Sequence, residues 1–139
     1  MGAGRAEGLV RSIDTNVLAR FIVRDDPAQA EVATEILRGD VLLTPTVMLE
    51  TAWLLASRYG MKRSIVSLSL ADIVSLSNVT VRDERLVFWA LERVREGADF
   101  ADMIHLVESR DARIFATFDG RLARHAGADA PIAIETLEA

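Results

Sequence analysis

Four acidic residues of this sequence stand where carboxylates are unusual, and together they could bind a metal ion. Two of them, Asp14 and Asp119, come directly after short apolar stretches of the kind that form buried strands. The other two, Glu50 and Asp102, have mostly apolar neighbours within helical segments. A carboxylate seldom lies among apolar residues unless it is paired or ligated. Because hard oxygen ligands select Mg²⁺ or Mn²⁺, the four acids predict a site for a divalent cation.

Each acid also has a purely structural interpretation, which the sequence alone leaves open. Asp14 and Asp99 both suit the N-cap of a helix. Asp102 suits the first turn of a helix, where a negative charge interacts favourably with the helix dipole. Glu50 could be a solvated residue between apolar stripes, and Asp119 could begin a turn. No acid is decisive singly, so the prediction depends on their joint placement.

The elements that must position these acids alternate between short strands and helices. Strands are expected at about residues 9–13, 41–43, 79–81, 114–118 and 131–134. The segments between them have helical spacing of apolar residues, which predicts an α/β fold with a central, mainly parallel sheet of four to five strands. Ligands of such sheets bind beyond the carboxyl ends of the strands. The strand ends at Asp14 and Asp119 would therefore share one edge if their strands are neighbours.

Length and composition limit the classes of function. The 139 residues suit one domain, expected over residues 11–139, with residues 1–10 as an N-terminal tail or extension. The absence of cysteine excludes disulfides, thiolate metal sites and cysteine nucleophiles. A net charge of −5 argues against a nucleic-acid binder with a basic surface. With no long apolar run and no secretory leader, we expect a cytoplasmic protein without membrane association.

The order and spacing of these motifs resemble the PIN-domain ribonucleases, and closely the VapC-type toxins of bacterial toxin–antitoxin pairs. The resemblance covers residues from about 11 to 137, nearly the whole chain. The segments that carry it are Ile13–Leu18, Leu49–Leu55, Asp99–Asp102 and Ala116–Asp119, with Arg24–Ala30 as a further likeness. Any one of these segments is a weak signal, whereas all of them in this order are specific.

The resemblance implies a three-layer α/β/α fold and a cluster of acids that is both catalytic and metal-binding. The residues it implies are Asp14, Glu50, Asp102 and Asp119, with Asp99, Thr15, Asn16 and Thr117 as auxiliary residues. The implied partners are an RNA substrate, a second copy of the chain in a homodimer, and a cognate antitoxin whose tail covers the site. Mg²⁺ is the expected cofactor, with Mn²⁺ as a possible substitute.

The predicted reaction is hydrolysis of an RNA phosphodiester by a metal-activated water. Carboxylates and a phosphodiester repel one another, so a cation has to bridge them. Two other classes stay open. A phosphotransferase would form an aspartyl-phosphate on Asp14, although Asn16 stands where a second acid is expected and Lys62 is the only lysine. A non-catalytic, acid-lined α/β module would bind a partner without turnover.

Three further groups of side chains carry expectations. His105 is expected in the core or behind the site, and His125 on the surface. The candidates for RNA contacts are Arg20, Arg24, Arg58, Lys62 and Arg121. An apolar group offers more bulk than one short helix pair needs, and any exposed part would suit an amphipathic antitoxin helix. Its members are Phe21, Ile22, Trp53, Leu54, Leu55 and Tyr59.

Overall fold

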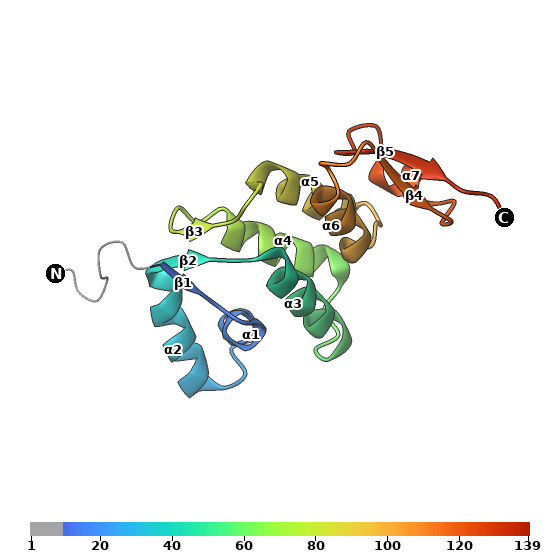
Figure 1. Cartoon of the computed structure of the whole chain (residues 1–139). Helices are drawn as coiled ribbons and strands as arrows, with labels where there is room; N and C mark the ends of the chain where they lie inside the picture. The colour runs from blue at the N-terminus through green and yellow to red at the C-terminus, as the bar shows by residue number, and fades with distance from the viewer. Residues whose placement is uncertain (1–9) are drawn as a thin grey trace. The chain divides into compact units, whose positions relative to one another are not determined.

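The computed structural model describes residues 10–139, which form two compact units (Figure 1). The first unit runs through Glu84 and the second covers Arg85–Ala139. Each unit is described by itself, and the expectation of one domain over residues 11–139 stays a prediction. Most of the expected tail, residues 1–9, lies outside the described residues, but Val10 belongs to the first strand.

The first unit combines a parallel sheet with helices. Its strands pair in the order β1-β2-β3, with Arg11 opposite Val41 and Val41 opposite Val79. In chain order its elements are β1 (Val10–Ser12), α1 (Thr15–Val23), α2 (Pro27–Arg38), β2 (Asp40–Leu42), α3 (Pro45–Ser57), α4 (Arg63–Val74) and β3 (Val79–Thr80).

The helices of this unit begin where the local sequence dictates. Asp14, Asp26 and Thr44 cap α1, α2 and α3, and each accepts a hydrogen bond from a backbone N–H three residues later. Pro27 and Pro45 occupy the first turns of α2 and α3, where a missing N–H costs nothing. Because the first residue of α1 and of α3 is fixed in this way, the face of the helix on which each side chain lies is fixed as well.

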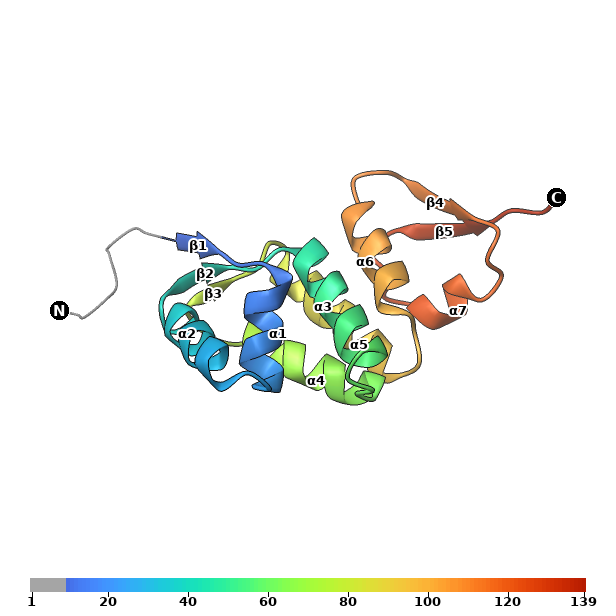
Figure 2. The same cartoon turned by 90° about the horizontal axis from the view of Figure 1, so that it is seen from below.

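Helix packing buries one face of each helix in the first unit. Helix α1 packs against both α2 and α3, and α3 packs against α4 (Figure 2). The most enclosed side chains include Leu18 of α1, Val41 of β2, Leu55 of α3 and Leu70 of α4. Burial of such side chains is the main favourable term in folding. It holds the start of α1 beside the middle of α3.

The second unit combines helices with a parallel pair of strands. Its core includes Val87, Leu91, Met103 and Leu106. Strands β4 and β5 pair in parallel over their whole length. In chain order the elements are α5 (Glu84–Arg95), α6 (Phe100–Glu108), β4 (Ile114–Thr117), α7 (Leu122–Ala126) and β5 (Ala133–Thr136).

The last strand starts two residues later than the sequence predicts. Pro131 has no N–H to donate to a strand ladder, and Ile132 is buried before the strand begins. The pairing instead continues past the end of β5, where the Leu137 N–H donates to the Thr117 carbonyl at 2.7 Å.

The predicted mixed α/β class and parallel pairing are confirmed. The five strands of the described chain are hydrogen-bonded as two sheets, one in each unit. No helix within residues 10–139 has the length and apolar character needed to cross a membrane.

Candidate active site

The carboxyl end of β1 leads directly into the segment Asp14–Asn16. Asp14 is the N-cap of α1, and its Oδ1 accepts a hydrogen bond from the backbone N–H of Val17 at 3.0 Å. The capping interpretation of Asp14 is therefore right. A capping carboxylate keeps its negative charge, so capping is compatible with ligating a cation.

Glu50 reaches this strand end from the middle of α3. The Thr15 hydroxyl donates to Glu50 Oε1 at 2.7 Å, which links residues 35 positions apart. Glu50 itself is exposed, whereas the next residue, Thr51, is fully buried. Glu50 is therefore more than a solvated residue on a helix surface, because a side chain from another helix holds its carboxylate.

A pocket of about 300 Å³ opens at this junction of α1 and α3. Its walls include two carboxylates, a hydroxyl, an amide and an indole. The lining residues are Asp14, Thr15, Asn16, Glu50, Trp53 and Leu54. The first unit thus brings together four of the residues predicted for the site.

The second unit holds a separate set of acids at the start of α6. Asp99 is the N-cap of this helix and accepts from the Asp102 backbone N–H at 3.1 Å. Asp102 is half-buried in the first turn, and burial raises its pKa above the ordinary value. The charges of Asp99 and Asp119 raise the pKa of Asp102 further. A half-buried carboxylate with acidic neighbours is poorly satisfied without a cation.

Asp119 lies in a turn just after β4. Its backbone N–H donates to Thr117 Oγ1 at 3.0 Å, and its own Oδ1 accepts from the Arg121 backbone N–H at 2.9 Å. The turn interpretation of Asp119 is therefore right. Arg121 Nε also lies 3.8 Å from Asp119 Oδ1, in an exposed ion pair. Thr117 thus holds the backbone of this turn, and the Arg121 N–H holds the carboxylate.

His105 is exposed on α6, so the interpretation that places it in the core is wrong. The buried face of this helix is formed by residues such as Met103, Ile104 and Val107, and position 105 falls opposite them. His125 is half-buried rather than exposed. The charges of both histidines act on Asp102 against its acidic neighbours and lower its pKa, less strongly than burial raises it.

Arg20, predicted to contact RNA, is engaged within the first unit. Its Nη1 donates to Asp25 Oδ1 at 3.0 Å and to the Tyr59 hydroxyl at 3.1 Å, and its Nε donates to Gln29 Oε1 at 2.7 Å. The Tyr59 hydroxyl donates in turn to Asp25 Oδ2 at 2.9 Å. This network joins the ends of α1 and α3 to the start of α2.

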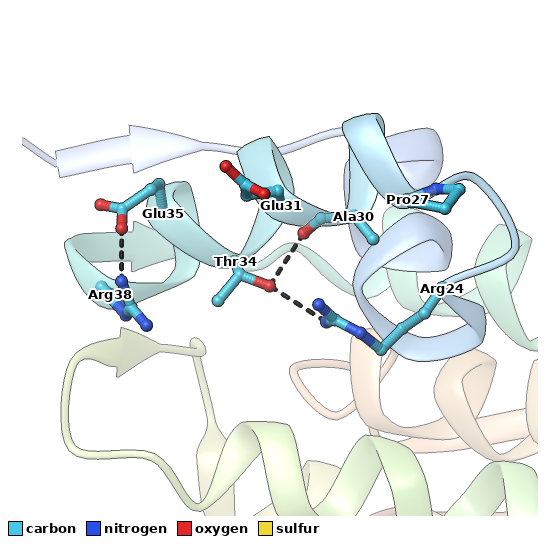
Figure 3. Close-up of a pocket in the computed structure, with 7 residues that line it drawn as sticks. All are labelled: Arg24, Pro27, Ala30, Glu31, Thr34, Glu35 and Arg38. Carbon is cyan, nitrogen blue, oxygen red and sulfur yellow. Dashed lines mark hydrogen bonds and ion pairs between the residues drawn. The ribbon is translucent and has the colours of Figure 1, made fainter.

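Arg24, the second candidate for RNA contact, lies at one end of a different pocket of about 360 Å³ (Figure 3). Its guanidinium donates to Thr34 Oγ1 at 3.0 Å, and the Thr34 hydroxyl donates to the Ala30 carbonyl. Arg38 pairs with Glu35 further along α2. With two arginines and two glutamates in its walls, this pocket does not favour a ligand of either charge.

The apolar group predicted to face a partner is only partly exposed. Leu55 is fully buried on the face of α3 that forms the core, so it is not among the exposed members of this group. Trp53 and Tyr59 remain exposed, at 67% and 37%. A groove of about 410 Å³ between α1 and α2 was not predicted, although the one-turn spacing of Val32 and Ile36 on α2 was a signal for it.

The acids fit a hard divalent cation by donor chemistry. In neither unit, over residues 10–139, do three Asp, Glu or His side chains lie close enough to hold a metal ion. The pocket in the first unit nevertheless offers oxygen donors from Asp14, Thr15 and Glu50, and the acids of the second unit are also oxygen donors. Oxygen-only sets suit Mg²⁺ or Mn²⁺ rather than softer ions.

A parallel α/β chain with carboxylates at strand ends and helix starts has the features of a metal-dependent enzyme acting on phosphate esters. The model of the PIN domain family matches residues 12–128, so this chain belongs to the PIN domain family. PIN domains are generally metal-dependent nucleases. Neither a curated protein nor a solved structure matches the chain.

Proposed function

We propose that this PIN domain is an endoribonuclease that hydrolyses RNA phosphodiester bonds with Mg²⁺, or with Mn²⁺ in its place. One observation carries the proposal: the Thr15 hydroxyl holds Glu50 at the strand end that bears Asp14. Two carboxylates from different helices that line one pocket offer oxygen donors to a divalent cation.

The proposed metal-binding residues are Asp14, Glu50, Asp102 and Asp119. When bound, the ion supplies Lewis acidity toward the phosphate and lowers the pKa of a water molecule. The remaining residues act on geometry. Thr15 orients Glu50, and Thr117 holds the turn that carries Asp119. Asp99 caps the helix that bears Asp102, and the exposed amide of Asn16 is available to hydrogen-bond the substrate.

The full-length chain and a short single-stranded RNA provide the test. We expect cleavage with Mg²⁺ or Mn²⁺, no cleavage in EDTA, and products that carry a 5′-phosphate. Glu50→Gln should lower kcat/KM by about 100-fold or more, because it removes a preorganised charge from the site. Glu31→Gln on the exposed side of α2 is the matched control and should cleave like the unaltered chain. Equal activity of the folded Glu50 variant, or of the chain in EDTA, would contradict the proposal.

We further propose that the chain acts as the toxin of a toxin–antitoxin pair, forms a homodimer, and is neutralised by a small protein that covers the site. Expression without that partner should stop growth, and Glu50→Gln should relieve the inhibition. Light scattering of the isolated protein should give the mass of two chains. A soluble, folded Glu50→Gln variant that remains fully toxic would show that toxicity, if any, does not come from RNA hydrolysis.

A further inference from the structure

Trp53 exposes 67% of its surface from α3, although Thr51 and Leu55, two residues before and after it, are fully buried. Isolated exposed apolar side chains are common and need no explanation. Trp53 differs from them in its location, because its indole lines the same pocket as Asp14 and Glu50. A large aromatic side chain therefore stands open to solvent beside the proposed catalytic carboxylates.

Helix geometry fixes the indole relative to these acids. Trp53 follows Glu50 by three residues, so the two side chains are neighbours on one side of α3. The opposite side of the helix, which includes Met48 and Leu55, is anchored in the core. Trp53 thus projects from a rigid element, and an aromatic ring with only two side-chain torsions loses little entropy on contact.

We infer that the Trp53 indole is a stacking platform for an unpaired base of the RNA, adjacent to the phosphodiester that is cleaved; this rests on the proposed function. Unpaired bases in single-stranded RNA are commonly held by stacking on aromatic side chains. A base is neutral, so it can approach the two carboxylates without the repulsion that a phosphate meets. The base of a nucleotide that flanks the cleaved bond therefore suits this position.

The polar character of the pocket favours a base over an apolar side chain of a partner protein. Four of its six lining residues, Asp14, Thr15, Asn16 and Glu50, are polar. An apolar anchor would take water away from the two carboxylates and the Asn16 amide without supplying hydrogen bonds in its place, which is costly. A base instead has hydrogen-bonding edges that the Asn16 amide can meet. The platform selects unpaired RNA, and since every base has a π-face, it tolerates many sequences.

A substrate that lacks one base tests this inference. The cleaved bond of a single-stranded RNA oligonucleotide is first mapped with the unaltered chain and Mn²⁺. Two further oligonucleotides then carry an abasic nucleotide on one or the other side of that bond. We expect one of them to be cleaved with kcat/KM about tenfold lower than the intact RNA, mainly through KM, because stacking on that base is lost.

The protein variants complete a double-mutant cycle. Trp53→Ala should lower kcat/KM for intact RNA by about the same factor and should no longer distinguish the abasic substrate. Trp53→Phe, which keeps a π-face, should restore much of the discrimination. Leu68→Ala, which truncates an exposed apolar side chain of α4, is the control and should behave like the unaltered chain.

The outcomes separate this inference from the proposed function. No metal-dependent cleavage of intact RNA by the unaltered chain would overturn both. Cleavage of both abasic substrates at the intact rate by the unaltered chain would overturn the inference alone, whatever the variants do. Normal cleavage of intact RNA by Trp53→Ala would also overturn the inference. The exposed indole would then be better explained as a contact for a partner protein.

Discussion

Asp25 lies between α1 and α2, and Asp102 lies in the first turn of α6; their surroundings shift their pKa values in opposite directions. At Asp25 both carboxylate oxygens are bonded, one to Arg20 and one to the Tyr59 hydroxyl. The Tyr59 hydrogen bond and the Arg20 charge lower the pKa of Asp25, although partial burial opposes them. The carboxylate of Asp25 is thus satisfied by this chain alone.

Asp102 has the opposite environment. Burial raises its pKa, and the nearby charges of Asp99 and Asp119 raise it further. No arginine or lysine contributes to that balance, and the two histidines offset it only in part. A carboxylate whose charge the fold does not satisfy is a candidate for binding a cation or for catalysis, whereas a satisfied one is a structural residue. The comparison therefore predicts different behaviour for two chemically identical side chains.

The largest difference is expected in catalysis. Asp102→Asn should lower kcat/KM for RNA cleavage by about 100-fold or more, because it removes a proposed metal ligand while keeping the shape. Asp25→Asn makes the same chemical change in the satisfied pair and should retain activity close to that of the unaltered chain. Cleavage rates of both variants with Mn²⁺ show whether Asp102 and Asp25 differ in their contribution to catalysis. Similar losses in the two variants would contradict the division between a functional and a structural aspartate.

Metal binding should sharpen the same contrast in stability. A cation that binds only the folded chain stabilises it, by about 2.7 kcal/mol at a concentration 100 times its Kd. Saturating Mn²⁺ should therefore raise the Tm of the unaltered chain and of Asp25→Asn by roughly 5–10 °C. Asp102→Asn should respond much less. Thermal melts with Mn²⁺ and with EDTA measure this, and an unchanged Tm in the unaltered chain would argue against metal binding by the folded chain.

A smaller effect is expected when no metal is present. A raised pKa in the folded state means that the folded chain binds more protons at Asp102 than the unfolded chain does. Stability from this group is thus complete below the ordinary pKa of aspartate and is lost as pH rises through the raised value. In EDTA at neutral pH, Asp102→Asn should be as stable as the unaltered chain or a few degrees more stable. The gap should close on acidification, and a gap that is independent of pH would contradict the electrostatic explanation.

Local features of this fold could be predicted from the sequence because their causes lie within a few residues. Asp26 and Pro27 start α2 through a hydrogen bond that spans three residues, and Asp14 starts α1 in the same way. The exposure of His105 was also within reach, since apolar residues at helical spacing in α6 place position 105 on the opposite face. Short-range rules of this kind predict where helices and strands form and which residues of the candidate site lie at their ends.

Features that depend on packing between distant segments could not be predicted in the same way. The Thr15–Glu50 hydrogen bond exists because α1 packs against α3, and no local pattern selects Thr15 as the donor. Arg20 is a reasonable candidate for RNA contact on residue type alone. Only the convergence of three segments shows that Asp25 and Tyr59 already engage it. Likewise, the pairing of β5 with β4, which continues to Leu137, depends on contacts between segments almost 20 residues apart.

The smallest expected effect is on stability and concerns Asp25, whose carboxylate is already hydrogen-bonded within the chain. Tyr59→Phe removes the hydroxyl that donates to Asp25 and accepts from Arg20, and it leaves the aromatic ring in place. A lowered pKa in the folded state gives stability that is present above the ordinary pKa of aspartate and lost as pH falls through the lowered value. At neutral pH, Tyr59→Phe should therefore lower the Tm slightly, by at most about 3 °C, since exposed ion pairs contribute little. Melts from about pH 7 to about pH 3 should show this deficit shrinking as Asp25 is protonated. A deficit of constant size over that range would show that the hydroxyl acts through packing and not through the charge of Asp25.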